Sequence, residues 1–394
     1  MVDWFEEEVE EIKEDNDEQE VKKSKEERKR EKMAKLEKRK QAAQANNSGP
    51  TLAGATGTLR PTGIKKPKNL LPHEEQMWDT IDAFEDRAWS NVATGIPTGF
   101  KGIDKALDGG WQTGWILVGG DSNIGKTSFL SQLAWKTAEV NQDVYVLDFS
   151  LDDPMHDKIP RVVASANKVL INAVKNPNGY AHLPKMLQRR EDGLKQLRDA
   201  INRYRCLDAN HSTDVDKIED TIKETLVNLE LEAQTTGVKK RLVVFIDNFH
   251  DLSTTAREAV GSDKQKYDYL AQKVSDLATK YDICIVTTGE FKKLNGYRRP
   301  GLDDLRESVK IKYEAKAILL CYNEVGLKGE ASSIYYEVQG DATKKPVFEV
   351  KFGKNKMGSF KGRVFFEFYP ELAYFEEADT QSTKRYNNLI YANE

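Results

Sequence analysis

A glycine-rich stretch between an apolar run and a helix-like run carries the clearest chemistry in this sequence. It reads G-x-x-x-x-G-K-T from Gly120 to Thr127. Backbone N–H groups of such a loop surround phosphates, Lys126 reaches the β and γ oxygens, and the Thr127 hydroxyl binds Mg²⁺. A chance glycine turn is the alternative, but residues 115–118 read as a strand and residues 128–140 as a helix, which is the required context. The expected nucleotide contacts are Gly120, Asp121, Ser122, Asn123, Ile124, Gly125, Lys126, Thr127 and Ser128.

Acidic residues follow two further apolar runs. Asp247 ends the run LVVFID, where P-loop enzymes place an acid that holds Mg²⁺ beside the loop threonine. Many parallel strands end this way, but the spacing of about 120 residues after the loop favours the functional role. Asp152 and Asp153 follow the run VYVLDFS, at an edge where open α/β sheets bind ligands. One of them would orient the attacking water, or they would cap the next helix.

Composition bounds the class of protein. The 394 residues carry a formal net charge of −4, so any contact with nucleic acid must come from a local basic patch. Cys206, Cys284 and Cys321 lie far apart, which predicts a reduced intracellular protein without a zinc site. The N-terminus is acidic and no apolar run approaches the ~20 residues of a membrane span. We therefore expect a soluble, cytoplasmic protein without a membrane partner.

The chain divides by composition into four parts. Residues 1–70 have few core-forming side chains and end in a Gly-, Pro-, Ser- and Thr-rich stretch, which predicts a disordered charged tail and linker. Residues 71–93 hold one amphipathic helix, whose apolar face needs the main domain or an adjacent subunit as a partner. The main domain is expected over residues 94–378, and residues 379–394 are expected to be a C-terminal tail.

Apolar runs and helical patterns alternate through the main domain, which predicts an α/β fold with a mostly parallel sheet and helices on both faces. After Asn323 the runs alternate apolar and polar residues, which is typical of antiparallel strands at the sheet edge. The predicted strands are residues 115–118, 144–149, 205–208, 242–247, 283–287 and 317–322. The predicted helices include residues 185–204, 217–234 and 267–280.

The segment TGIPTGFKGIDKALDGGWQTGWILVGGDSNIGKTSFL resembles the opening of the ATPase domain of DnaB-type replicative helicases, which have a RecA-like fold. The motifs FSLDDP, FIDNFHDL, RRPGLDDLRES and GKNKMG follow in the family's order, so the resemblance extends from about Thr94 to Phe375. It implies a hexameric ring that hydrolyses ATP with Mg²⁺ at subunit interfaces and threads single-stranded DNA through its centre.

The resemblance also implies roles for single residues. Asp152 matches the catalytic glutamate, Glu290 the sensor glutamine and His250 another glutamine. Lys354 and Lys356 match a basic pair that reaches the neighbour's ATP site. The implied catalytic set is Lys126, Asp152, Asp247, Glu290, Lys354 and Lys356, and the implied metal ligands are Thr127 and Asp247.

A DNA-binding loop is implied by the match of Arg306, Glu307 and Ser308 to the family's central loop. Arg298 and Arg299 form the densest basic cluster nearby, and local cations are enough to contact phosphates. A solvated loop would have the same composition. We therefore predict single-stranded DNA as a partner, contacted by Arg298, Arg299, Arg306, Glu307 and Ser308.

Some positions depart from the family pattern. Asp152 is shorter than glutamate by one methylene, His250 and Glu290 are ionisable, and Lys356 stands where the family has an arginine. These changes weaken the inference of hydrolysis but not that of ATP binding. A rival interpretation is therefore a slowly hydrolysing DNA-binding switch: a helicase loader, an accessory factor or a recombinase-like filament protein.

We expect the first 70 residues to differ from the family as well, with a charged tail in place of the compact helical domain that contacts primase. Primase binding is therefore not carried over. Trp4 and Phe5 stand among acids, a composition suited to docking on another replication protein, with a merely solubilising tail as the alternative.

Overall fold

The computed structural model describes residues 66–89, 95–259, 261–293, 296–306, 309–338 and 340–393. The chain divides into two units, residues 1–93 with 338–342 and residues 94–337 with 343–394. Most of the predicted tail, including Trp4 and Phe5, lies outside the described residues, and so do Glu307 and Ser308.

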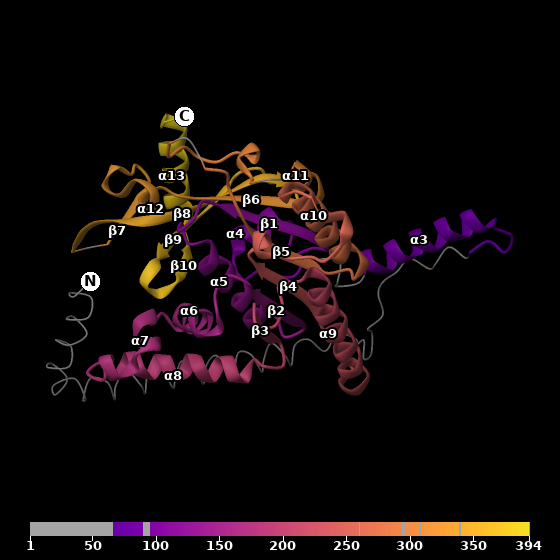
Figure 1. Ribbon diagram of the computed structural model, residues 1–394, viewed down its shortest axis with the longest axis horizontal. Helices are drawn as coiled ribbons and strands as arrows, with labels where there is room; N and C mark the ends of the chain where they lie inside the picture. The colour runs from indigo at the N-terminus through magenta and orange to yellow at the C-terminus, as the bar shows by residue number, and fades with distance from the viewer. Residues whose placement is uncertain are drawn as a thin grey trace, which may run out of the picture. The chain divides into compact units, whose positions relative to one another are not determined.

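The larger unit is built on one sheet, which has ten strands among the described residues (Figure 1). Its strand order is β10-β9-β8-β6-β1-β5-β4-β2-β3, and β7 pairs with β8. The strands are β1 (Gly114–Gly120), β2 (Val144–Ser150), β3 (Tyr204–Asp208), β4 (Arg241–Asp247), β5 (Cys284–Glu290), β6 (Ala317–Asn323), β7 (Tyr335–Val338), β8 (Asp341–Asn355), β9 (Arg363–Tyr369) and β10 (Tyr374–Glu377). Strands β1 to β6 pair in parallel, and β8, β9 and β10 extend the sheet in antiparallel pairs. This confirms the predicted mostly parallel sheet with antiparallel edge strands.

Helices precede, connect and follow the strands along the chain. They are α4 (Lys101–Ala106), α5 (Lys126–Val140), α6 (Met155–Asn167), α7 (Ile171–Lys175), α8 (Pro184–Asp199), α9 (Val215–Thr236), α10 (Asp263–Lys280), α11 (Val309–Glu314), α12 (Glu324–Lys328) and α13 (Thr380–Asn393). Helix α9 is capped at both ends: the Asp214 carboxylate accepts hydrogen bonds at its start, and Gly237 ends it with a φ of 73°. The predicted helix 185–204 is too long, because α8 ends at Asp199 and Tyr204 already begins β3.

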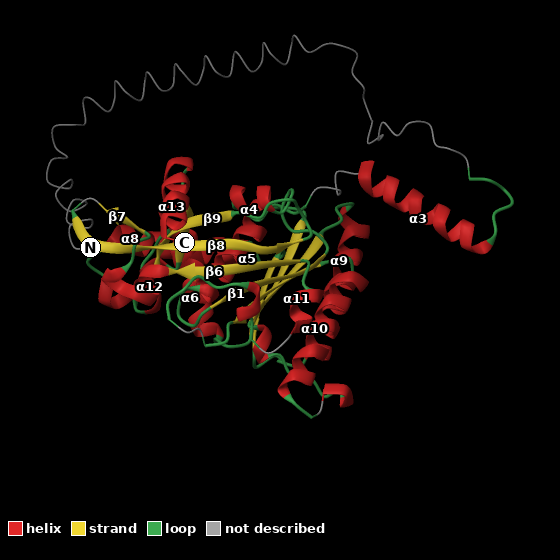
Figure 2. Ribbon diagram, turned by 90° about the horizontal axis from the view of Figure 1, so that it is seen from above, coloured by secondary structure: helices red, strands yellow, loops and turns green. Residues whose placement is uncertain are grey.

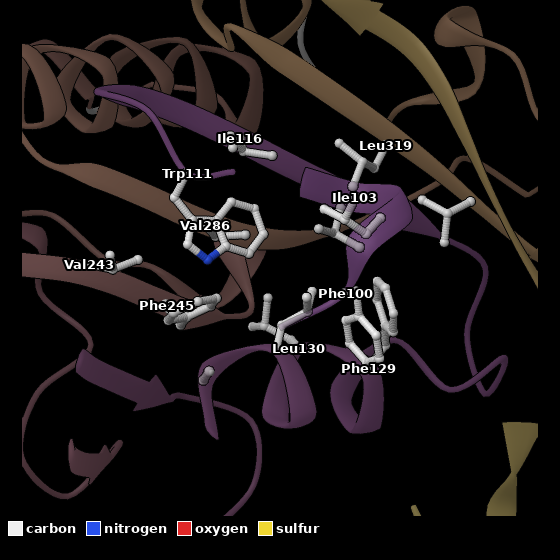
Figure 3. Close-up of a cluster of buried hydrophobic side chains, with 14 of the residues drawn as sticks. Phe100, Ile103, Trp111, Ile116, Phe129, Leu130, Val243, Phe245, Val286 and Leu319 are labelled. Carbon is white, nitrogen blue, oxygen red and sulfur yellow. The ribbon is translucent and has the colours of Figure 1, made fainter. Parts of the chain in front are cut away.

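Two apolar clusters cover the two faces of the sheet, because alternate strand residues point to opposite sides. On one face, Ile116 and Val118 pack with Phe129 and Leu130 of α5 and with Trp111 (Figure 3). On the other face, Trp115 packs with residues of α9 and α10. Figure 2 shows α9 and α10 next to one another. Burial on both faces explains why the central strands read as continuous apolar runs.

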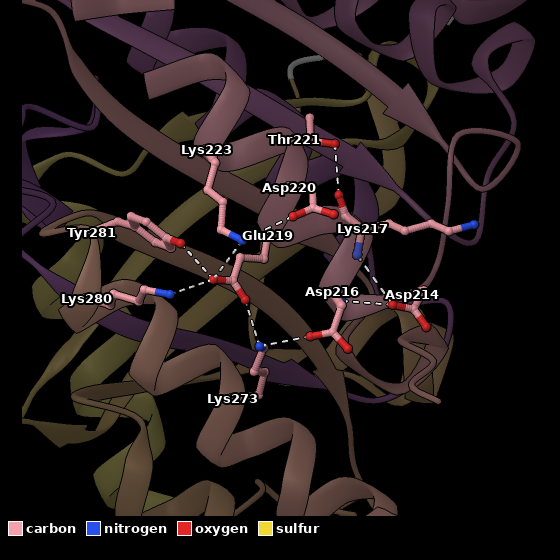
Figure 4. A network of polar contacts seen from close by, with 10 residues as sticks. All are labelled: Asp214, Asp216, Lys217, Glu219, Asp220, Thr221, Lys223, Lys273, Lys280 and Tyr281. Carbon is pink, nitrogen blue, oxygen red and sulfur yellow. Dashed lines mark hydrogen bonds and ion pairs between the residues drawn. The ribbon is translucent and has the colours of Figure 1, made fainter. Parts of the chain in front are cut away.

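A carboxylate network joins α9 to α10 (Figure 4). The side chain of Glu219 is only 7% exposed. It accepts hydrogen bonds from Lys273, Lys280 and Tyr281 at 2.7–2.8 Å. Burial by itself would raise the pKa of Glu219, but these hydrogen bonds hold the pKa well below its ordinary value.

Replacing Glu219 with glutamine should therefore lower the free energy of unfolding at pH 7 by about 1–3 kcal/mol. Because the folded-state pKa is depressed, this contribution is fully present above the ordinary value of 4.5 and is lost as the pH falls below it. Urea unfolding of both proteins at pH 7 and pH 3.5 should show the difference narrowing in acid. Glu224→Gln, which changes an exposed carboxylate on the same helix, is the control. An equal effect of both substitutions would contradict the assignment.

The residues after 378, expected to be a tail, instead contain helix α13. Tyr386 and Ile390 lie one turn apart on it and are buried. The Tyr386 ring lies 5.4 Å from the ring of Phe365 in β9. The composition of this segment is too polar to predict a packed helix, but two buried side chains, Tyr386 and Ile390, hold it on the fold.

The smaller unit contains helix α3 (Pro72–Trp89). Lys66 binds Glu75 and Asp79 of this helix at 2.9 and 2.7 Å. Met77, Ile81 and Phe84 are 48–66% exposed. The amphipathic helix predicted over 71–93 is thus present as α3, and these three apolar side chains are exposed. Among the described residues, every helix is too short or too polar to cross a lipid bilayer.

Candidate active site

The loop between β1 and α5 has the backbone that a phosphate-binding loop requires. Gly125 has a φ of 108°, and a Cβ there would lie 2.9 Å from the Phe368 ring. A Cβ at Gly120 would lie 2.7 Å from the Ile124 side chain. Sterics therefore require glycine at Gly125, and a side chain at Gly120 would displace that of Ile124. Gly125 offers no side-chain cap to α5, so the first N–H groups of this helix are available to an anion.

Lys126 lies over this loop. Its Nζ donates to the carbonyl oxygen of Asp121 at 2.6 Å. Burial lowers the pKa of Lys126, and the nearby charges of Glu290 and Asp247 oppose that shift. The ammonium group is thus bonded to the loop and close to the charges of Glu290 and Asp247.

Asp247 fits a role as a magnesium ligand. It is buried at the end of β4, and its Oδ1 accepts a hydrogen bond from the Thr288 hydroxyl. Its Oδ2 is buried without a hydrogen-bond partner among the described residues. An unpaired buried carboxylate oxygen is costly unless a cation or water binds it. Oxygen ligands such as this carboxylate and the Thr127 hydroxyl suit Mg²⁺.

The two acids after β2 have different partners. Asp153 forms an ion pair with Arg161 of α6, whereas the Asp152 backbone N–H lies 3.3 Å from the carbonyl oxygen of Asp247. The N-cap of α6 is Pro154, so neither acid has that position. Burial, and then the charges of Asp153 and Asp247, raise the pKa of Asp152. The geometry therefore favours Asp152 as the acid of the site.

A buried ion pair holds the element that follows Asp152. Lys158 of α6 and Asp148 of β2 are fully buried, with Nζ and Oδ1 3.0 Å apart. The Tyr204 hydroxyl donates to the other oxygen of Asp148 at 2.7 Å. Since these groups fasten α6 to the sheet, they also fix the turn that carries Asp152.

Asp251 is an acid that the sequence patterns did not single out. Partial burial and the charges of Asp152 and Asp247 raise its pKa to about 6. The only signal in the sequence is its place four residues after Asp247. Asp251 thus adds a further carboxyl group close to Asp152 and Asp247.

His250 is neutral at physiological pH, because burial lowers its pKa to about 4. Its Nδ1 accepts the backbone N–H of Glu290 at 3.3 Å. Nε2 therefore carries the hydrogen, and it is buried without a hydrogen-bond partner among the described residues. A neutral ring with one free donor can serve as a glutamine amide would, so this departure from the family pattern is mild.

The basic residues predicted to bind DNA separate in the structure. Arg306 reaches Glu290 at 2.8 Å. Arg298 is half-exposed and pairs with Asp304. The prediction for Arg299 needs correction: its side chain is 17% exposed, and its Nε lies 2.8 Å from the buried Glu349. The Arg299 guanidinium is used inside the fold, so it is not a surface cation.

Lys354 and Lys356 lie at the opposite end of the strands from the phosphate loop, level with the start of β1. The Lys356 N–H donates to the Lys316 carbonyl, level with Trp115 at the start of β1. About five strand residues, roughly 17 Å, separate that level from Gly120. Lys356 is exposed at that level, too far from Gly120 for its side chain to reach the phosphate loop of its own chain.

The neighbouring lysine is differently placed. Lys354 donates to the carbonyl oxygens of Lys312 and Tyr313 in the last turn of α11. Burial, and then the charge of Lys356, lower the pKa of Lys354 to about 8. Lys354 therefore holds α11, while Lys356 extends into solvent.

The fold and the loop together define an α/β protein of the P-loop nucleotide-binding class. Within it, the model for the DnaB-like helicase C terminal domain matches residues 95–377. The chain therefore belongs to the DnaB-like helicase C-terminal domain family, as the motifs predicted.

Known relatives agree with this assignment. The chain is 24% identical over 332 residues to the replicative DNA helicase DnaB of Pasteurella multocida and 21% identical over 336 residues to that of Haemophilus influenzae. These matches cover 83% and 84% of the chain but 65% of each relative, so the chain spans just under two thirds of their length.

Solved structures share the fold. One solved ATPase domain superposes with a TM-score of 0.62 at 19% identity, covering 77% of this chain and 98% of that domain. A structure of a DnaB-like replicative helicase and its interactions with primase gives a TM-score of 0.61 at 19% identity, covering 80% of this chain and 69% of the other. The RecA-like fold expected from the motifs is thereby confirmed.

Proposed function

We propose that this protein is an ATP-driven, ring-shaped translocase on single-stranded DNA that acts as a replicative helicase. The observation that carries the proposal is that the catalytic groups lie at opposite ends of the strands of one sheet. The carboxyl ends of the parallel strands bring together the phosphate loop, Asp247 and Asp152, while Lys356 lies at the opposite ends of the strands. A complete site then needs two subunits, as in a head-to-tail ring.

In this proposal each subunit contributes distinct chemistry. The loop N–H groups and Lys126 would hold the β and γ phosphates, and Thr127 and Asp247 would hold Mg²⁺, whose charge would neutralise that of the phosphates. Asp152 orients the attacking water and receives its proton. The neighbour's Lys356 stabilises the charge that develops on the transferred phosphoryl group.

The assembly would depend on helix α3. Its exposed Met77, Ile81 and Phe84 form an apolar face, and such faces bury themselves against a partner. We assign this partner to the adjacent subunit of a hexamer. DNA would pass the loop that contains Arg306, with Arg298 as a second cation, because both guanidinium groups are at least 43% exposed.

The slowly hydrolysing switch is the second candidate function. The shorter Asp152 and the exposed Lys356 favour it, since both depart from residues that promote fast hydrolysis in the family. A switch would bind ATP and DNA as well as a translocase does, but it would hydrolyse ATP slowly.

Two measurements on the purified protein distinguish these functions. ATP hydrolysis should accelerate at least about tenfold with single-stranded DNA for a translocase, and a fork substrate should be unwound. Mass photometry with ATP should show a hexamer for the full chain and for residues 71–394, but smaller species for residues 92–394. A rate that does not rise when single-stranded DNA is added would favour the switch, and rings that survive the longer deletion would refute the role of α3.

A further inference from the structure

Glu290 and Arg306 connect the nucleotide edge to the DNA loop. The Arg306 Nη1 lies 2.8 Å from the Glu290 Oε2, and the two side chains are 43% and 32% exposed. Glu290 ends β5 in register with Gly120, where the phosphate loop begins. The Glu290 carboxylate is also the first of the charges that act on Lys126. One solvent-accessible ion pair thus joins residues that belong to different proposed sites.

The backbone around this ion pair is held on both sides. The Glu290 N–H donates to His250, and its carbonyl oxygen accepts the Arg306 N–H at 3.0 Å. Phe291 and Leu305 form an antiparallel bridge next to them. With the main chain fixed, only the two side chains need to rotate for the ion pair to open.

We propose that Glu290 competes with single-stranded DNA for Arg306. Without DNA the carboxylate binds the guanidinium, and a backbone phosphate replaces it when DNA binds. A carboxylate and a phosphate both present paired oxygens to the guanidinium fork, so one can substitute for the other. The released Glu290 then adds an unpaired negative charge beside Lys126, so DNA binding changes the charge at the edge where ATP is hydrolysed. This inference rests on the proposed function.

The Glu290→Gln variant tests the competition, because glutamine keeps the size of the side chain and removes its charge. Anisotropy of a fluorescent oligothymidylate, measured without nucleotide at several salt concentrations, should show binding about two- to fivefold tighter than wild type. The salt slope should not change, because the number of phosphates contacted is the same. Asp303→Asn is the matched control. It removes one negative charge from the same loop, at an exposed carboxylate whose ion-pair partner is Lys312.

A second background isolates the ion pair itself. In an Arg306→Ala protein, Glu290→Gln should leave DNA affinity unchanged, since no guanidinium remains to compete for. Equal tightening by Glu290→Gln and Asp303→Asn, or the same gain in the Arg306→Ala background, would overturn this inference while leaving the proposed function intact. A wild-type protein that binds no single-stranded DNA would overturn both.

Discussion

Replacing Lys126 with alanine should lower kcat for ATP hydrolysis by at least about 10³-fold. The Lys126 ammonium is the loop's own cation; it donates to the Asp121 carbonyl oxygen and lies near the charges of Glu290 and Asp247. Without it, charge on the β and γ oxygens loses its fixed counter-charge. Phosphate release under saturating ATP and DNA measures the loss. The same protein should keep its fold, because the lysine makes its one described hydrogen bond to the loop.

Two companions make this test specific. Asp247→Asn should be comparably inactive, because the amide that replaces Oδ2 is a poorer ligand for Mg²⁺. Lys105→Ala removes an exposed lysine from α4 and should hydrolyse ATP as wild type does. Thermal unfolding of all three proteins checks the fold. A Lys126→Ala protein that hydrolyses ATP at the wild-type rate would place the site elsewhere.

Lys356 should act on the ATP of the adjacent subunit, and its removal should lower kcat by about 10²-fold or more. Arginine fingers in trans contribute about 10³ to 10⁵ in rate, and an ammonium lacks the rigid fork of a guanidinium. Wild-type turnover should therefore be slow, and Lys356→Arg should raise it if the neighbour's site accepts the longer group. ATP binding should change little, since the phosphate loop belongs to the other subunit.

Mixed rings separate action in trans from a local effect. Lys126→Ala and Lys356→Ala subunits, each inactive alone, should recover activity when mixed, because about a quarter of the interfaces in an equal mixture then combine an intact loop with an intact Lys356. No recovery in rings confirmed by mass photometry would remove Lys356 from the site.

Arg363 is the alternative finger, and its surroundings argue against that role. Its side chain is 7% exposed, with Nε 2.7 Å from Glu349. Arg363→Ala should therefore lower the melting temperature, because it leaves Glu349 with one fewer cation. A selective loss of kcat in this variant at unchanged stability would return the finger to Arg363.

The sequence by itself determined the phosphate loop, the central strands and the family. The loop residues are consecutive in the chain, so the order of residue types is enough to predict the geometry of the loop. Strands that are buried on both faces are recognisable as continuous apolar runs. Asp247 was found for the same reason, since it ends the run that becomes β4. Each of these inferences needed only contacts within one segment.

The tertiary structure alone decided which charged groups are available. Arg298 and Arg299 are equivalent in the sequence, yet the second is internal because β8 brings Glu349 beside it from 50 residues away. Asp152 and Asp153 separate because α6 supplies Arg161 to one of them. The pairing of Glu290 with Arg306 depends on the bridge between two distant loop segments. A charged side chain pairs with whichever opposite charge the fold brings within about 4 Å of it. For two residues on different elements, the distance between their side chains does not follow from their spacing in the sequence.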